Sequence, residues 1–427
     1  MLRLVLSLLS LSQHLIFMVS FHVAVFIFSI YRFVIQLYRK YFHHHHKTAA
    51  VDHDGKQTSN HAIVWNKLIR LAVGHNLKSV ASFRQASRRY VPLLYPPLQA
   101  PYFGCAEKVE KIDKLRNSYW ITMKKHQRHQ QQNTLHSTRK VMLFIHGGGF
   151  ISGHPIGLDA QSVLFSINDF NKSHSSSSNT VKCSHVLSVE YRLNEDPKSY
   201  ATMDRNALCE SLDDQLQDCF DCFMYLIEEL KIPAKDIILG GYSAGANHCM
   251  SLILHKLLPM VLRKDNSTLH SSPVVWPIHS VSLFSAPCDI SNTIISNDQW
   301  RQENVLVLTK GMVDLIHMCV TVQDKLKYSI LKNIKDMEEE YGDDEVWNAL
   351  FQTKRWIINY SNHEELTPGN EYLVNLFQKN VQKLADTNPH VICTVVNENH
   401  QMHCYTTGYS VLPEAKRSMK TIMNSCF

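Results

Sequence analysis

The stretch Gly241-Tyr242-Ser243-Ala244-Gly245 decides the fold that we expect for this chain. Before it, Ile237–Leu239 is a short apolar run typical of a buried strand, and after it Ala244–Leu258 has apolar residues at helical spacing. The stretch matches the pattern G-x-S-x-G at a strand-to-helix turn. Such a turn is sharp and strained, and its outer residues must be small so that the crossing chains do not clash. The pattern predicts that Ser243 is a nucleophile.

A second glycine-rich motif lies upstream of the serine. His146-Gly147-Gly148-Gly149 follows the apolar run Val141–Ile145. Glycines here leave backbone N–H groups bare, so that they can approach an oxygen on which negative charge develops. Composition alone would produce H-G-G-G on the order of 0.001 times in such a chain. We interpret this motif as an oxyanion-binding loop that serves Ser243.

Short apolar runs alternate with helical patterns along the chain. The segment from Leu208 to Leu230, for example, has apolar residues at helical spacing. Apolar strands separated by helices are typical of a parallel sheet covered on both faces. The expected fold is therefore α/β with a mostly parallel central sheet, whose further strands are Val141–Ile145, Val186–Glu190, Val281–Phe284, Trp356–Ile358 and Val391–Val396.

The composition excludes several classes of protein. With 427 residues, 44% hydrophobic and 19% charged, the chain is neither a disordered tail nor a collagen. Eleven cysteines, an odd number without recurring spacing, do not form a disulfide framework. A net charge of +6 is too small to indicate a nucleic-acid partner. We expect one large folded unit that needs no metal and no organic cofactor.

The N-terminus indicates a membrane anchor. From Leu4 to Tyr31 the chain has no formally charged residue and is dense in Leu, Ile, Phe and Val. A transmembrane helix needs about 20 apolar residues, whereas the apolar core of a cleaved signal peptide has only about 7–15. We therefore predict a retained transmembrane helix with a basic juxtamembrane segment over residues 1–48. An amphipathic helix on the membrane surface is the alternative.

The signals for membrane orientation disagree. Positive charges are denser after the apolar run than before it, which by the positive-inside rule keeps the bulk of the chain cytosolic. N-glycosylation sequons would instead suit a lumenal domain, although chance gives roughly three in a chain of this composition. The sequence leaves glycosylation open at Asn171, Asn266 and Asn359.

Three motifs in this order resemble the hormone-sensitive-lipase-like branch of the α/β-hydrolases: HGGGF at His146–Phe150, YRL at Tyr191–Leu193 and GYSAG at Gly241–Gly245. That branch includes arylacetamide deacetylases and steryl acetyl hydrolases. The resemblance implies a lead-in or cap region over residues 49–140 and a catalytic core over 141–427, with a helical cap inserted at about 292–348. It also implies a structural role for YRL and an oxyanion hole of backbone N–H groups from Gly147, Gly148, Gly149 and Ala244.

The acid partner is less regular than the family pattern. A serine nucleophile needs a histidine base and a carboxylate that fixes the tautomer of the imidazole. The family places its acid three residues after a glycine that follows a strand. Aligning Ser361 with that glycine puts Glu364 in the acid position. Glu365 and Asp289 are the alternatives.

The base is expected after the last core strand, because the chain order in this fold is serine, acid, histidine. His400 and His403 both qualify. Family histidines are commonly followed two positions on by an aromatic ring, which Tyr405 supplies for His403. We predict His403 as the base and keep His400 as the alternative. Cys404 is interpreted as a small buried hydrophobe.

These residues predict a membrane-anchored serine ester hydrolase with a Ser243–His403–Glu364 triad. The resemblance implies short acyl esters of lipophilic alcohols, with steryl acetate as the substrate, and a single-pass protein of the endoplasmic reticulum with a lumenal catalytic domain. The alternatives are a lipase or esterase acting on acylglycerols and an inactive hydrolase fold that binds lipids. Aromatic residues expected in the cap favour a lipophilic substrate: Trp65, Tyr95, Tyr102 and Trp120.

Overall fold

A computed structural model describes the chain over residues 50–51, 57–58, 104–124, 139–175, 181–195, 204–263, 275–290, 316, 318–362, 364, 366–399, 401, 403–409 and 412–427. The predicted anchor, residues 1–48, lies outside these residues. Within them, no helix combines the length and the apolar character that a membrane crossing requires.

The chain divides into two compact units. The smaller unit, Met1–Asn60 with Pro92–Pro96, contains the antiparallel strands β1 (Ala50–Val51) and β2 (Gln57–Thr58). All other described residues belong to the larger unit, which contains every predicted site residue that the structure describes.

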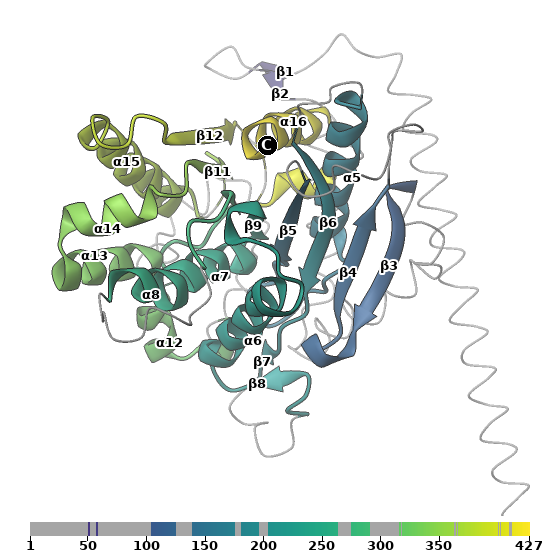
Figure 1. Cartoon of the computed structure of the whole chain (residues 1–427), viewed down its shortest axis with the longest axis horizontal. Helices are drawn as coiled ribbons and strands as arrows, with labels where there is room; N and C mark the ends of the chain where they lie inside the picture. Colours follow the sequence, from purple (N-terminus) through teal and green to yellow (C-terminus); the bar gives the residue numbers. More distant parts are fainter. Residues whose placement is uncertain are drawn as a thin grey trace, which may run out of the picture. The chain divides into compact units, whose positions relative to one another are not determined.

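The larger unit is built on an eight-stranded sheet with the strand order β12-β11-β10-β9-β5-β6-β4-β3 (Figure 1). Neighbouring strands are parallel from β12 to β6, whereas β4 is antiparallel to β6 and β3 is antiparallel to β4. The mostly parallel sheet predicted from the sequence is confirmed. Its strands are β3 (Ala106–Ile112), β4 (Ser118–Met123), β5 (Arg139–Ile145), β6 (Lys182–Val189), β9 (Ile237–Tyr242), β10 (Ser280–Phe284), β11 (Arg355–Ser361) and β12 (Ile392–Glu398).

Both faces of the sheet are covered by helices because the central strands are apolar on both sides. On β5, Leu143 and Ile145 pack into one hydrophobic cluster, and Met142 and Phe144 pack into another. The first cluster includes residues of α6 (Leu212–Met224), α7 (Ala244–Leu252), α8 (Leu258–Leu262), α13 (Ile330–Tyr341), α14 (Asp343–Leu350) and α15 (Thr367–Lys383). The second includes residues of α5 (Leu158–Ser173) and α16 (Pro413–Cys426).

Shorter elements complete the larger unit. A parallel pair joins β7 (Leu193–Asn194) to β8 (Leu208–Cys209). A π-helical stretch, Ile253–Leu257, links α7 to α8. The remaining elements are α12 (Val322–Lys327), the π-helical stretch Tyr225–Glu229 and the 3-10 turns Asp113–Leu115, Ala234–Asp236 and Tyr405–Gly408.

The sheet extends upstream of the core boundary predicted at residue 141. The hairpin of β3 and β4 forms one edge of the sheet, although the sequence analysis assigned its residues to the lead-in or cap region. Trp120 lies on β4, where its ring stacks on that of His185 at 4.8 Å, and so belongs to the sheet rather than the cap. The strand β3, with the sequence AEKVEKI, carries pairs of charged residues between single apolar ones, and charged residues are common on edge strands. It therefore gives no continuous apolar run. The other three aromatic residues expected in the cap lie outside the described residues.

The described part of the predicted cap insertion lies in the chain between β10 and β11. It forms α12, α13 and most of α14, and these helices contact one another, α7 and α8. Asn247 of α7 fixes this segment to the core, because its buried side-chain amide donates to the carbonyl oxygens of Pro287 (3.0 Å) and Tyr328 (2.9 Å).

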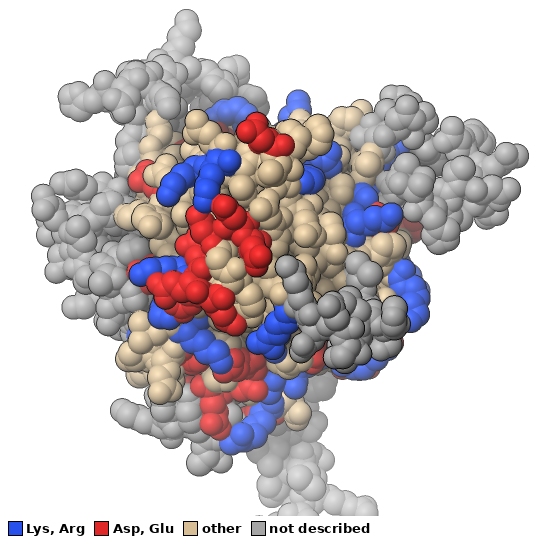
Figure 2. Space-filling model, turned by 60° about the vertical axis from the view of Figure 1, so that its left-hand side comes forward, with Lys and Arg blue, Asp and Glu red and all other residues tan. Residues whose placement is uncertain are grey.

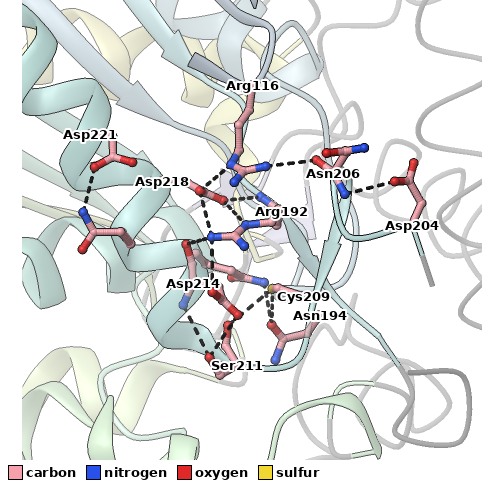
Figure 3. A network of polar contacts seen from close by, with 12 residues as sticks. Arg116, Arg192, Asn194, Asp204, Asn206, Cys209, Ser211, Asp214, Asp218 and Asp221 are labelled. Atoms are coloured by element: carbon pink, nitrogen blue, oxygen red, sulfur yellow. Dashed lines mark hydrogen bonds and ion pairs between the residues drawn. The ribbon is translucent and has the colours of Figure 1, made fainter. Parts of the chain in front are cut away.

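A charge network holds the YRL segment (Figure 3). Arg192 binds both carboxylate oxygens of Asp218, through Nε at 2.9 Å and Nη2 at 3.1 Å, and Arg116 reaches the same carboxylate at 2.6 Å. The Asp218 side chain is only 3% exposed, so losing either arginine would leave much of a buried charge uncompensated. The network ties the β3–β4 hairpin and the segment after β6 to α6, in keeping with a structural role for YRL.

The surface carries charge of both signs. On the face shown in Figure 2, acidic and basic side chains lie side by side. Lys383 of α15, for example, pairs with Asp343 and Asp344 of α14, each at 2.6 Å. Exposed pairs of this kind contribute about 0–1 kcal/mol each, so they favour solubility more than stability.

Candidate active site

The turn between β9 and α7 holds Ser243 in a strained conformation, with φ 49° and ψ −118°. A positive φ is unfavourable for a residue with a side chain and persists only where the surroundings enforce it. Here the surroundings are close-packed backbone, and the glycines Gly241 and Gly245 permit that packing. A Cβ atom on Gly241 would lie 2.4 Å from the backbone of Gly245, and one on Gly245 would lie 2.1 Å from the carbonyl oxygen of Ile145. Larger residues at either position would push the turn away from β5.

Two hydrogen bonds connect the serine to a histidine and a glutamate. His403 Nε2 lies 2.9 Å from Ser243 Oγ, and His403 Nδ1 lies 3.2 Å from Glu364 Oε2. Glu364 follows β11 and His403 follows β12, so the two adjacent parallel strands bring them together at the same edge of the sheet. In this geometry the imidazole can take the serine proton while the carboxylate holds the opposite ring nitrogen.

The structure thus brings together the first choices for the three positions. The alternatives Glu365 and His400 lie outside the described residues. Asp289, the third candidate acid, lies beyond the end of β10. Cys404 is partly buried and packs against the second hydrophobic cluster, as expected of a small apolar side chain.

The glycine loop is fixed by hydrogen bonds to its carbonyl groups. The hydroxyl of Tyr191 donates to the carbonyl oxygen of His146 at 3.0 Å, and the rings of these two residues stack at 4.3 Å. At the other end of the loop, the carbonyl oxygen of Phe150 accepts from Gln215 Nε2 at 2.8 Å and from the backbone N–H of Asn194 at 2.9 Å. The first residue of YRL and a buried residue of α6 therefore hold the two ends.

Three backbone N–H groups next to the serine are left as donors. Among the described residues, none accepts a hydrogen bond from the N–H of Gly148, Gly149 or Ala244. Gly148 has φ 124°, a conformation that side chains rarely adopt, and a Cβ atom there would lie 2.1 Å from the carbonyl oxygen of Ser152. Only glycine fits this position, and no side chain shields the N–H groups of Gly148 and Gly149 on the loop itself.

The sequence predicted Gly147 as one of the oxyanion donors, and the structure shows that its N–H is not available for this role. Its N–H donates to Asp159 Oδ2 at 2.8 Å, and its single proton is therefore engaged within the protein. Gly147 serves the loop by allowing close approach, because a Cβ atom there would lie 2.9 Å from the carbonyl oxygen of Tyr242.

The comparisons with known proteins concern the fold that carries this site. No family model and no curated protein sequence matches the chain. Many solved structures do match it. One is an esterase from the bacterial hormone-sensitive lipase family, with a TM-score of 0.58 and 14% identity over 87% of this chain and 98% of that one. The chain has the α/β-hydrolase fold.

Two further α/β-hydrolase structures are similar to the chain. A hyperthermophilic esterase from the archaeon Pyrobaculum calidifontis has a TM-score of 0.51 and 13% identity over 84% of this chain and 96% of that one. An esterase/lipase from an uncultured bacterium has a TM-score of 0.51 and 13% identity over 86% and 98%. The resemblance inferred from HGGGF, YRL and GYSAG is confirmed at the level of the fold.

Apolar residues cover the loop from the side of the predicted cap. A Cβ atom on Gly149 would lie 2.6 Å from Ile316 Cδ1, and Ile316 packs with Ile151 and Cys319. Apolar cover of this kind lowers the local polarity and strengthens hydrogen bonds to a developing charge. Among the described residues, no group of three or more His, Cys, Asp or Glu side chains could hold a metal ion.

Sequence reasoning missed Asp159 and Gln215, which hold the loop without belonging to a motif. Asp159 lies in the first turn of α5, and a stronger search for acidic residues at helix starts could have singled it out. Gln215 points inward from the amphipathic helix α6 and had no such signal.

The pKa of His403 reflects opposing effects. Burial of the ring acts to lower the pKa, while the contacts with Cys404 and with Glu364 act to raise it, and the net pKa lies well above that of free histidine. Burial also raises the pKa of the Cys404 thiol, which is therefore uncharged near neutral pH. With the thiol uncharged, the Glu364 carboxylate is the negative charge beside the ring that favours the imidazolium, and His403 can accept the serine proton only above its raised pKa.

We predict that Glu364→Gln lowers the pKa of His403, because it removes a negative charge in hydrogen-bond contact with the ring. The imidazole signal followed by NMR over a pH titration measures this change. Glu371→Gln, the same substitution on the exposed side of α15, is the control and leaves the pKa of His403 unchanged. An unaltered titration in the Glu364 variant would contradict the assigned contact.

Proposed function

We propose that the protein is a serine carboxylic-ester hydrolase. The observation that carries the proposal is the continuous hydrogen-bond chain from Ser243 through His403 to Glu364, beside the N–H donors of Gly148 and Ala244. Nucleophile, base, orienting acid and oxyanion donors are the set that acyl transfer requires. The similarity in fold to solved esterases adds support.

The reaction begins with attack by Ser243 Oγ on the ester carbonyl carbon, as its proton passes to His403 Nε2. The negative oxygen that forms accepts hydrogen bonds from the N–H groups of Gly148, Gly149 and Ala244. His403 then gives its proton to the alcohol oxygen as the C–O bond breaks, which leaves an acyl-serine. A water molecule, deprotonated by His403, attacks this ester and releases the carboxylic acid. Each proton passes between His403, serine, alcohol and water, so the sequence of steps needs no metal or cofactor.

The proposed nucleophile can be tested directly. We predict that a fluorophosphonate probe labels the purified protein and that Ser243→Ala abolishes labelling, because the probe reacts with an activated serine. Ser425→Ala, on α16, is the control and retains full labelling. If the wild-type protein is folded and the probe does not label it, the proposal of an enzyme is wrong. An inactive hydrolase fold that binds lipids is then the better interpretation.

We further propose that the substrates are short acyl esters of lipophilic alcohols, with steryl acetate as the best of them. The apolar run from Leu4 to Tyr31 would hold the enzyme at a bilayer, where such esters reside. The apolar cover over the oxyanion loop, formed by Ile151, Ile316 and Cys319, suits a lipophilic group. The motif resemblance to the deacetylase members of the branch supports an acetyl group.

The substrate class predicts a clear preference. The pure protein in detergent micelles is expected to release acetate from a steryl acetate at least about 100-fold faster than it releases fatty acid from a long-chain triglyceride, measured at equal mole fraction. Such a ratio equals about 2.7 kcal/mol of difference between the two barriers. Cleavage of the triglyceride with the steryl acetate left intact would support the alternative, an acylglycerol lipase.

We also propose that the chain is a single-pass protein of the endoplasmic reticulum membrane with its catalytic domain in the lumen. The apolar run and the family resemblance support this placement. The asparagine side chains of two sequons are buried and hydrogen-bonded, which disfavours a glycan on them. Asn171 donates to the carbonyl oxygen of Cys183, and Asn359 donates to that of Val396. Asn266, outside the described residues, is therefore the sequon on which a glycan is expected.

Membrane orientation can be read from a glycan. We predict that endoglycosidase treatment of the natural protein increases its gel mobility and that Asn266→Gln removes this change, whereas Asn171→Gln does not. An untreated protein that already migrates without a glycan would favour the cytosolic side. The excess of positive charge after the apolar run and the eleven free thiols would both suit that side.

A further inference from the structure

We propose that Asp159 is a positioning residue that holds the oxyanion loop in its working conformation. This inference rests on the proposed esterase function and adds to it a residue outside the predicted motifs. Asp159 makes no contact with Ser243 or His403, so its effect would pass through the backbone of the loop.

The Asp159 carboxylate joins two segments of the chain. One oxygen, Oδ2, accepts the N–H of Gly147 at 2.8 Å, and the other, Oδ1, accepts the N–H of Ala160 at 2.9 Å. The first bond reaches the oxyanion loop and the second lies in the first turn of α5. The loop is thereby fixed to the start of a sixteen-residue helix that packs along the sheet.

The bond to Gly147 completes the restraint of one peptide plane. The carbonyl oxygen of His146 accepts from the hydroxyl of Tyr191 at 3.0 Å, and the N–H of Gly147 belongs to the same planar peptide unit. With both ends bonded, this plane cannot rotate. The next N–H groups in the chain are those of Gly148 and Gly149, which are proposed to bind the oxyanion.

Restraint is needed here because the loop consists of glycines. Each glycine has access to more backbone conformations than any other residue, so fixing one costs more conformational entropy. A loop tethered only by its carbonyl groups could turn its N–H groups away from the serine at little energetic cost. Asp159 is the side chain that binds the amide immediately before the donors.

The position of the charge is informative as well. Burial raises the pKa of Asp159 above that of a free aspartate, although the hydrogen bonds from Gly147 and Ala160 act to lower it. A partly buried carboxylate close to a developing oxyanion opposes the same negative charge that the loop must stabilise. A residue at this place is therefore useful for the conformation that it imposes and not for its charge.

The test compares three substitutions at one position. Asp159→Ala removes the tether, and we expect kcat to fall roughly 10²-fold with KM changed less than about 2-fold, as for the loss of a group that acts only in the transition state. Asp159→Asn keeps an oxygen that accepts from Gly147 and restores kcat to within about 10-fold of wild type. Asp159→Ser keeps a small polar side chain in the first turn of α5 but is too short to reach Gly147, and we expect it to behave like Asp159→Ala.

Affinity for an alkyl trifluoromethyl ketone, which forms an oxyanion on the serine, provides the second readout. We expect it to fall in parallel with kcat in the Ala and Ser variants. Asp169→Ala is the matched control, since Asp169 lies on the same helix and accepts a hydrogen bond from Tyr409 at 2.6 Å, away from the loop. It is expected to change thermal stability without changing kcat.

Two outcomes would overturn the inference. One is an Asp159→Ser protein that is folded and has wild-type kcat and ketone affinity; the other is a loss confined to KM or to thermal stability. If Asp159→Ala does not fold, the Asn and Ser variants alone decide. Failure of the proposed esterase function can be told apart from failure of the inference about Asp159. In the first case the wild-type protein itself would lack both ester hydrolysis and fluorophosphonate labelling.

Discussion

The active site depends on direct backbone contact between two crossing segments. A Cβ atom on Gly245 would lie 2.1 Å from the carbonyl oxygen of Ile145 and 2.6 Å from that of His146, and one on Gly147 would lie 2.9 Å from the carbonyl oxygen of Tyr242. The turn that carries the serine therefore rests on the loop that carries the oxyanion donors. No side chain separates them, so the nucleophile and the donors share one rigid frame.

This contact explains how much of the site could be predicted from the sequence. Close backbone approach requires glycine, and the two glycine motifs are the parts of the site that a sequence displays directly. The central strands are buried on both faces and so appear as apolar runs. Because β11 and β12 are parallel neighbours, the residues after them meet, so chain order limited the acid and base to a few candidates. The choice of Glu364 and His403 among them came from the family resemblance, through the alignment at Ser361 and the aromatic ring of Tyr405.

The parts that could not be predicted depend on contacts made only in the folded chain. The strand β3 carries four exposed charged residues, so its sequence resembles a polar lead-in, and only pairing with β4 makes it part of the sheet. The N–H of Gly147 resembles those of its neighbours in sequence, and the carboxylate of Asp159 alone removes it from the donors. Partners that are distant in sequence and not glycine leave no comparable pattern.

The N-termini of α5 and α7, the two helices that begin at this site, have different roles. The first turn of each helix has unpaired N–H groups and a partial positive charge that favours an anion. At α5 that preference is met within the protein, because Asp159 accepts from Ala160 in the first turn. At α7 the N–H of Ala244 has no acceptor among the described residues. The fixed carboxylate thus orders the loop from one helix, while the other helix retains its positive end for the charge that forms on the substrate.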